Sequence, residues 1–176
     1  SRVLVELSEA RLRGNDETEA VERAIFIQAP NRVFGVVFWF VVLGPVGAWL
    51  FRTTDLCRRR AAFEAHRSPE RPAPVLRGVE LIHAVLLWVP VRLAALGYAL
   101  SGSFDEAVER WRAGAAKTLP LHRRNDALSA NVGRAAMAGS LDQPENSSLA
   151  ARNAMRLVTR TLFIWLTVIA FMTLFG

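Results

Sequence analysis

Hydrophobic residues gather in three long blocks, separated by polar segments. The first block, residues 33–51, contains no charged side chain and lies between Arg32 and Arg52. The last block is uncharged from Thr161 to the end of the chain. Because a helix needs about 20 apolar residues to cross a bilayer, the pattern predicts transmembrane helices at about 33–51 and 159–175.

The middle block, residues 79–100, differs because Pro90 and Arg92 lie within it. An arginine at the centre of a spanning helix costs at least ~2.5 kcal/mol. The flanking segments, 52–78 and 101–156, are both rich in arginine. Since basic loops stay on the cytoplasmic side, a single crossing would place one of them on the wrong side. We therefore expect 79–100 to be a buried, interfacial or re-entrant helix.

Glycine and proline divide the first part of the chain. Residues 2–28 have helical periodicity and predict two short amphipathic helices, broken at residues 14–16. Pro30 predicts a second break, because the residue before a proline is disfavoured in the helical conformation. Gly44 and Pro45 predict a kink within the first membrane segment.

The polar segments predict further helices outside the membrane. Ser103, with Glu106 three residues later, has the spacing of a capping box and predicts a helix start. Residues 68–74, "SPERPAP", predict a linker. The expected fold class is an all-α integral membrane protein, with amphipathic cytoplasmic helices and a single membrane domain over residues 1–176.

Composition and charge favour a membrane surface as the basic residues' partner. The chain is 52% hydrophobic, and its 22 basic residues exceed its 16 acidic ones, giving a net charge of +6. The aromatic residues lie in the apolar blocks rather than among the arginines, which argues against nucleic-acid binding. We expect Arg52, Arg58, Arg59 and Arg60 to contact lipid headgroups. Expected partners are the bilayer, and other membrane proteins or a second copy of the chain.

Familiar catalytic and metal-binding motifs do not occur in the sequence. It has one cysteine, Cys57, and no HExxH, Walker, GxSxG or GxGxxG motif. His66, His83 and His122 show no metal-ligand spacing, so no metal site and no cofactor are predicted. Glu80 and His83 lie three residues apart near a helix start, which favours a capped or solvated pair over a functional site. Arg92 requires a partner if it is buried, either in a structural ion pair or in a ligand contact.

Two apolar stretches carry a family resemblance. "FGVVFWFVVLGPVGAWLFR" and "LLWVPVRLAALGYALSGSFDEAVERW" resemble the conserved half of AmpE proteins, which are inner-membrane proteins associated with induction of chromosomal β-lactamase. "NVGRAAMAGSL" resembles a motif of the CobD/CbiB family, the membrane amide synthases of cobalamin biosynthesis. Members of these families begin with further membrane helices. The resemblance therefore implies that this chain is the C-terminal part of a longer protein.

Departures from the synthase pattern imply a protein without that activity. In "APNRVFGV", Phe34 stands where the synthases carry an acidic residue, and in "RTTDLCRRR" only Asp55 is retained. A ligase that handles phosphate groups needs such metal-binding positions. The resemblance then makes Asn31, Asp55, Arg92 and Asn131 remnants of an ancestral pocket.

The expected function is that of a non-catalytic regulatory or accessory protein in the bacterial inner membrane, with its basic loops in the cytoplasm. By the resemblance, it would act in signalling during β-lactamase induction. Two alternatives remain open at this point. One is a structural subunit of a larger membrane complex, and the other is a cobalamin-pathway amide synthase.

Overall fold

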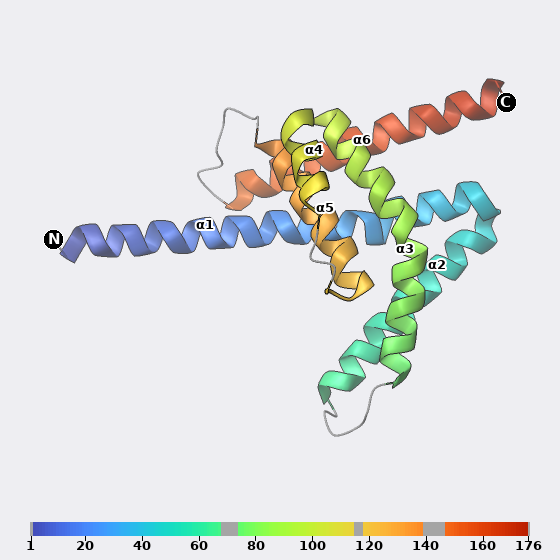
Figure 1. Ribbon diagram of the computed structural model, residues 1–176, viewed down its shortest axis with the longest axis horizontal. Coiled ribbons are helices and arrows are strands. Elements are labelled where there is room, and N and C mark those ends of the chain that lie inside the picture. The colour runs from blue at the N-terminus through green and yellow to red at the C-terminus, as the bar shows by residue number, and fades with distance from the viewer. Residues whose placement is uncertain (1, 68–73, 115–117, 139–146, 176) are drawn as a thin grey trace.

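A computed structural model describes residues 2–67, 74–114, 118–138 and 147–175 (Figure 1). Regular structure in these residues is helical throughout, which confirms the all-α prediction. The elements are α1 (Arg2–Ala29), the π-helix η1 (Pro30–Phe34), α2 (Gly35–Arg67), α3 (Pro74–Ser101), α4 (Phe104–Ala113), α5 (Leu121–Met137) and α6 (Ser147–Phe175). The predicted linker 68–74 lies almost entirely outside the described residues.

Three stretches within the described residues are long and apolar enough to cross a membrane. They lie in Asn15–Glu64, Leu76–Ser101 and Ser147–Phe175. The central stretch, in α3, is the most enclosed: 39% of its most apolar window is buried within the protein, against 17% for each of the others. This agrees with the prediction that 79–100 packs among other helices.

The N-terminal part of the chain is more continuous than the sequence predicted. α1 runs without a break through residues 14–16, so the prediction of two short helices is wrong. A helical glycine costs only about 1 kcal/mol relative to alanine, which the neighbouring helix formers outweigh. The predicted break at Pro30 is also wrong. Pro30 begins the π-helical turn, and the Gly35 N–H bonds to its carbonyl, so the helix widens there instead of ending.

The predicted kink at Gly44–Pro45 is confirmed, and it is a reversal of the chain. Gly44 has φ 68° and ψ −157°, a conformation essentially restricted to glycine. The two arms of α2 then lie against each other. Gly35 faces the Phe51 ring, and Gly47 faces the carbonyl oxygen of Trp39. Figure 1 shows α2 turning back at its right-hand end. We call residues 33–51 the α2 hairpin.

Two tryptophans donate hydrogen bonds that connect α3 to neighbouring helices. Pro90 has no N–H, so the carbonyl of Leu86 loses its partner within the helix. The Trp39 indole Nε1 on α2 donates to that oxygen at 3.0 Å. From α6, Trp165 Nε1 donates to the carbonyl of Leu93 at 3.1 Å. The proline in α3 is therefore accommodated by a hydrogen bond from a neighbouring helix.

Replacing Trp39 by phenylalanine should lower the free energy of unfolding by about 1–3 kcal/mol, because the Leu86 carbonyl would be left without a donor. Denaturation of the purified protein in detergent, followed by circular dichroism, measures this loss. Trp49 is exposed and provides the control, since Trp49→Phe removes an indole that faces outward. Equal stability of the Trp39→Phe variant and the unaltered protein would contradict the role given to this hydrogen bond.

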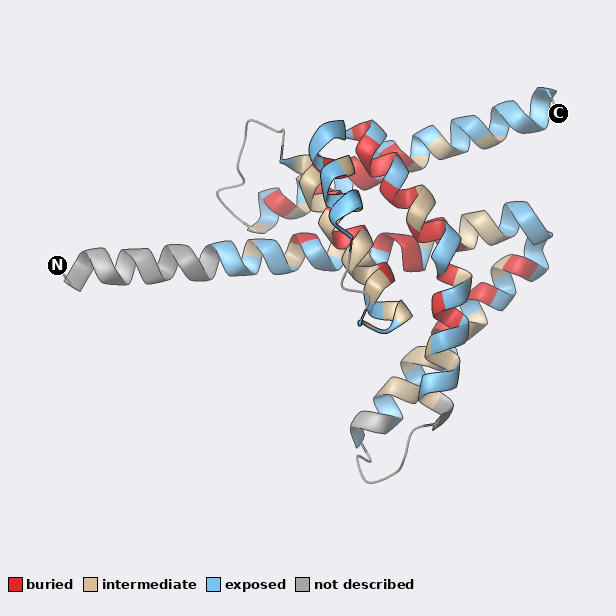
Figure 2. Ribbon diagram, viewed as in Figure 1, coloured by how far each residue is buried: buried red, intermediate tan, exposed pale blue. Residues whose placement is uncertain are grey.

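The main core forms where α1, α3, α5 and α6 cross. The Phe26 and Phe34 rings pack edge-on to Tyr98, with centroids 5.1 and 6.1 Å away. From α5, Ser129 Oγ donates to the carbonyl of Phe26 at 2.6 Å. Figure 2 shows the buried residues concentrated at this crossing, while the turn of α2 and the C-terminal part of α6 are largely exposed.

α4 begins where the sequence predicted. Ser103 is its N-cap residue, but the side chain makes no capping hydrogen bond. Instead, the Ser103 backbone N–H donates to the carbonyl of Ala136 on α5 at 2.8 Å. The start of α4 is therefore fixed by contact with α5. The predicted helix start is confirmed, and the predicted side-chain cap is wrong.

Candidate functional site

Three buried polar side chains meet where η1, α2 and α3 come together. Asn31, Asp55 and His83 are only 4%, 0% and 2% exposed. His83 Nε2 lies 2.9 Å from Asn31 Oδ1 and 3.9 Å from Asp55 Oδ1. We call these three residues the polar cluster. Two of them, Asn31 and Asp55, were predicted site residues, and the structure brings them to the same histidine.

The hydrogen bonds select one tautomer of the neutral His83 ring. Asn31 Nδ2 donates to the carbonyl of Ile27 at 2.7 Å, so its Oδ1 accepts the bond from His83 Nε2. The neutral ring therefore carries its proton on Nε2, and Nδ1 is an acceptor. Nδ1 is buried and has no hydrogen-bond partner within the described residues, and the Phe51 ring lies 5.1 Å from the imidazole.

Arginines of the same helix surround the Asp55 carboxylate. Arg58 Nη2 lies 3.1 Å from Oδ1, Arg59 Nη2 lies 2.9 Å from Oδ2, and Arg52 Nη1 is 3.6 Å away. The spacings i−3, i+3 and i+4 place all three on one face of α2. A buried carboxylate requires such compensation because desolvation of an unpaired charge is costly. Arg60 instead pairs with Glu64 at the surface.

The arginine placements refine the lipid-headgroup prediction. Arg52, Arg58 and Arg59 are partly exposed while they contact Asp55, so each can keep one edge toward the surroundings. Contact of these side chains and Arg60 with headgroups stays a prediction. The charges of Arg52, Arg58 and Arg59 also compensate the buried Asp55 carboxylate, a role that the sequence pattern alone did not indicate.

α5 contacts α3 next to the polar cluster. Asn125, which is buried, donates from Nδ2 to the carbonyl of Ala84 at 2.8 Å, next to His83 in α3. The neighbouring Asp126 is half-buried, and burial raises the pKa of its carboxyl above the ordinary value, although Arg58 and other nearby cations act in the opposite direction. Asn125 therefore connects α5 to α3 beside the polar cluster.

Of the two roles expected for Arg92, the described residues provide no ion pair, and contact with a ligand stays a prediction. The side chain is half-buried, and Nη1 donates to the carbonyl of Trp88 at 2.9 Å. Its guanidinium lies over the Trp88 ring, 3.8 Å from the centroid. The Trp88 carbonyl and ring are therefore the partners that the structure gives to the Arg92 guanidinium. Both of these contacts of Arg92 lie on its own helix, α3.

Asn131, the fourth predicted pocket residue, is half-buried on α5. Its neighbours Val132 and Gly133 are buried and face the core. A Cβ added to Gly133 would lie 2.5 Å from the Phe26 ring. The motif "NVGRAAMAGSL" therefore contributes a close-packing face in its described part, as its small residues suggest. The adjacent Arg134 pairs with Glu19 and Glu22 of α1, at 2.7 and 3.3 Å.

His83 is the residue that sequence reasoning placed wrongly, as part of a capped or solvated pair with Glu80. The spacing of His83 from the apolar residues that follow it indicated that its side chain is buried. His83, Leu87 and Val91 recur at intervals of four residues and are all buried. A histidine in the buried stripe of an apolar helix requires a polar partner. Among the described residues, no group of three or more histidine, cysteine, aspartate and glutamate side chains is placed to hold a metal ion.

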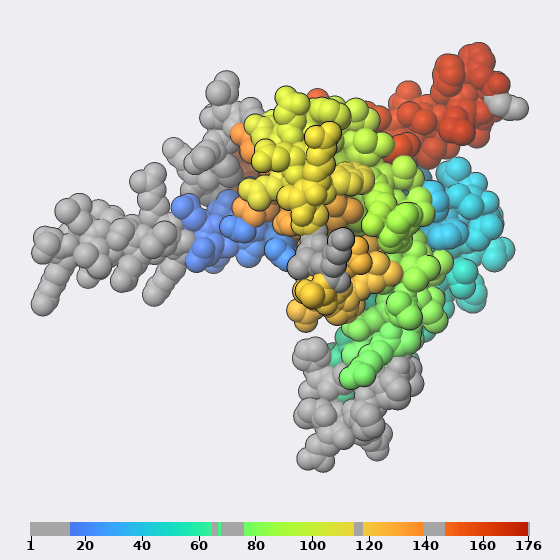
Figure 3. All heavy atoms as spheres, viewed as in Figure 1, coloured from blue at the N-terminus to red at the C-terminus, as the bar shows by residue number. Residues whose placement is uncertain are grey.

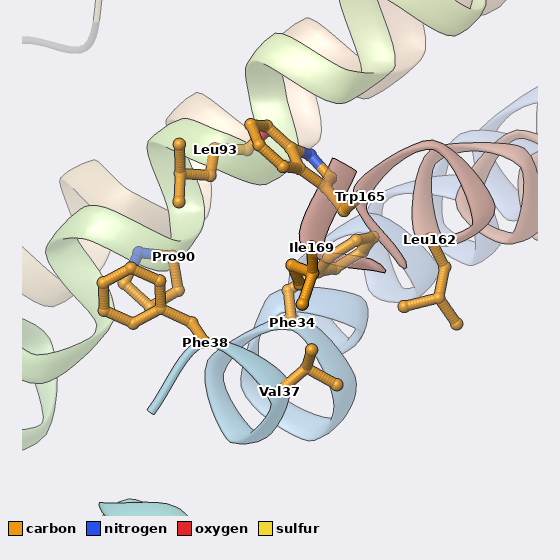
Figure 4. A pocket seen from close by; sticks show the side chains of 8 residues that line it. All are labelled: Phe34, Val37, Phe38, Pro90, Leu93, Leu162, Trp165 and Ile169. Carbon is orange, nitrogen blue, oxygen red and sulfur yellow. The ribbon is translucent and has the colours of Figure 1, made fainter. Parts of the chain in front are cut away.

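An apolar crevice lies between the α2 hairpin, α3 and α6, separate from the polar cluster (Figure 4). The residues that line it are Phe34, Val37, Phe38, Pro90, Leu93, Leu162, Trp165 and Ile169. The Trp165 indole N–H is already bonded to the Leu93 carbonyl. The lining can accommodate an apolar group, and its side chains carry no charge with which to orient a polar substrate.

Comparison with known proteins identifies the family. No curated protein and no solved structure matches the chain. A family model does match: AmpE, described as a regulatory signalling modulator protein, over residues 19–176. The match includes Asn31, Asp55, His83 and, apart from the first four residues of Asn15–Glu64, all three stretches that are apolar enough to span a membrane. The chain therefore belongs to the AmpE family of regulatory membrane proteins.

Proposed function

We propose that this protein is a non-catalytic regulator in the bacterial inner membrane that acts in signalling during β-lactamase induction. Membership of the AmpE family supports the regulatory role. The three apolar stretches support a place in the membrane. Basic residues on α2 and α5 fit the cytoplasmic side, because the positive-inside rule places arginine-rich segments there.

One observation carries the non-catalytic part of the proposal. The polar groups nearest to an ancestral active site are buried and engaged with one another: Asn31, Asp55 and His83 join η1, α2 and α3. A catalytic carboxylate must reach a substrate or a metal ion. Asp55, fully buried and compensated by Arg58 and Arg59, is better suited to holding helices together.

The test uses a bacterium whose chromosomal β-lactamase is inducible and which carries this protein. Deleting the coding sequence should change the ratio of induced to uninduced β-lactamase activity, and the intact protein supplied in trans should restore it. An unchanged ratio in the deletion strain would refute the proposed role. The same strain should synthesise cobalamin normally. Loss of cobalamin synthesis on deletion would instead favour the amide synthase.

The alternative of a structural subunit is favoured by the outer surface of α6. Phe163, Met172 and Leu174 are exposed large apolar residues on this helix. A photo-crosslinking amino acid at Phe163 should reach lipid if the protein acts as a free regulator. A protein adduct of fixed mass would favour a stable complex. The matched control is the same substitution at Trp165, whose indole is bonded to α3 inside the protein.

A further inference from the structure

We propose that the α2 hairpin is a re-entrant element, which enters one leaflet of the lipid bilayer and leaves on the side from which it came. Residues 33–51 are apolar and long enough to cross as a straight helix. The contacts within the hairpin are incompatible with a straight path. This inference concerns how the chain lies in the membrane and is independent of the proposed regulatory role.

The reversal rests on contacts between residues that a straight helix would keep far apart. Gly35 and Phe51 would be separated by about 24 Å along a continuous helix axis. Instead, Gly35 faces the Phe51 ring, and Gly47 faces the Trp39 carbonyl. Val36 and Trp39 of the first arm also pack against the cluster of Phe51, Leu87 and Val91.

The sequence at the turn explains why the reversal occurs there. Gly44 adopts φ 68°, which side-chain-bearing residues rarely adopt, and nothing lies within 4 Å of where its Cβ would be. Pro45 follows and has no N–H with which to continue the preceding helix. Gly35 and Gly47 then lack the side chains that would hold the arms apart. The three glycines and the proline together specify a helical hairpin.

The length and surface of the hairpin fit one leaflet. The first arm, residues 33–43, is about 16 Å long, roughly half of the ~30 Å hydrocarbon core. The tip of the hairpin, at Gly44–Pro45, is exposed and apolar, with Val46 72% exposed. The other exposed large apolar residues near the tip are Phe40, Val41, Val42 and Leu43. Exposed apolar surface continues toward the base at Trp49 and Leu50. Figure 2 shows this exposed tip at the right of the molecule.

Charge at the base of the hairpin supports lipid, rather than another protein, as the occupant. Because Gly35 meets Phe51, the adjoining Arg32 and Arg52 both lie at the open end of the hairpin. Arg58, Arg59 and Arg60 follow along α2, each partly or largely exposed. An apolar tip above a basic base matches the hydrocarbon and phosphate layers of a bilayer, with the arginines at the headgroups.

The native cysteine provides the first test. Cys57 is exposed and follows the hairpin, whereas Glu17 is exposed and precedes it. Cys57 in the unaltered protein, and a cysteine at position 17 in the double variant Glu17→Cys/Cys57→Ser, are labelled with a membrane-impermeant maleimide in sealed vesicles of both orientations. A re-entrant hairpin requires labelling from the same face. Labelling from opposite faces would show that 33–51 crosses the membrane and would overturn the proposal.

A second measurement tests the occupant in the unaltered protein. A phospholipid with a photoactivatable diazirine on its acyl chain is mixed into the membrane, and the products are cleaved with trypsin after Arg32, Arg52 and Arg160. The peptide 33–52 should carry the lipid adduct, as should the C-terminal peptide 161–176. Labelling of 161–176 without 33–52 would mean that lipid does not cover the hairpin tip, which overturns the proposal.

Discussion

Replacing Asp55 by alanine is expected to lower the free energy of unfolding by about 3–5 kcal/mol, the range for removing one partner of a buried ion pair. The carboxylate is fully buried, while Arg58 and Arg59 are partly exposed. Water can compensate part of the loss at the two guanidinium groups, so we expect the lower end of this range. Stability in mixed detergent micelles, titrated with SDS and followed by circular dichroism, measures the change.

The loss of stability in Asp55→Ala should arise because the carboxylate is buried, and not from the loss of a charge alone. Glu64→Gln provides the control, because the Glu64–Arg60 pair lies on the same helix but is largely exposed. Such surface pairs contribute less than about 1 kcal/mol, so this variant should unfold nearly as the unaltered protein does. If the Asp55 and Glu64 variants lost equal stability, burial of the Asp55 carboxylate would not be what holds η1, α2 and α3 together.

Much of the fold could be predicted because hydrophobic blocks and helix-breaking residues leave local signals. The apolar blocks indicated the three long helices, and Gly44–Pro45 indicated where α2 bends. The extent of the bend had no local signal. It depends on the backbone angle of Gly44 and on contacts between Gly35 and Phe51, sixteen residues apart. Continuity through Pro30 was likewise missed, because a π-helical turn accommodates the proline.

The candidate site could be predicted only in part. The family resemblance pointed to Asn31 and Asp55, and the structure joins them through His83. The identity of the joining residue depends on how α3 packs against α2, which a sequence pattern does not specify. Arg92 was expected to form an ion pair or to contact a ligand. It finds Trp88 one turn away on its own helix, an i,i+4 contact that leaves the side chain half exposed.

Small residues at helix crossings should be as sensitive to substitution as the buried ion pair. Gly133→Leu is expected to destabilise the protein by about 3 kcal/mol, the upper part of the range for overpacking a core. A Cβ at this position would lie 2.5 Å from the ring of Phe26, which is itself fully buried. Because Phe26 also packs on Tyr98, the ring cannot move away without disturbing α3.

The matched control for this prediction is Gly78→Leu in α3. Nothing lies within 4 Å of where a Cβ at Gly78 would be, so the leucine meets no obstacle. A helical glycine is also about 1 kcal/mol less favourable than a good helix former, so this variant should equal or exceed the unaltered protein in stability. SDS titration of both variants separates the effect of the added leucine itself from the effect of its collision with the Phe26 ring. If both lost stability equally, the added leucine itself would be responsible, whereas a loss confined to Gly133→Leu shows that the glycine permits the approach of α5 to α1.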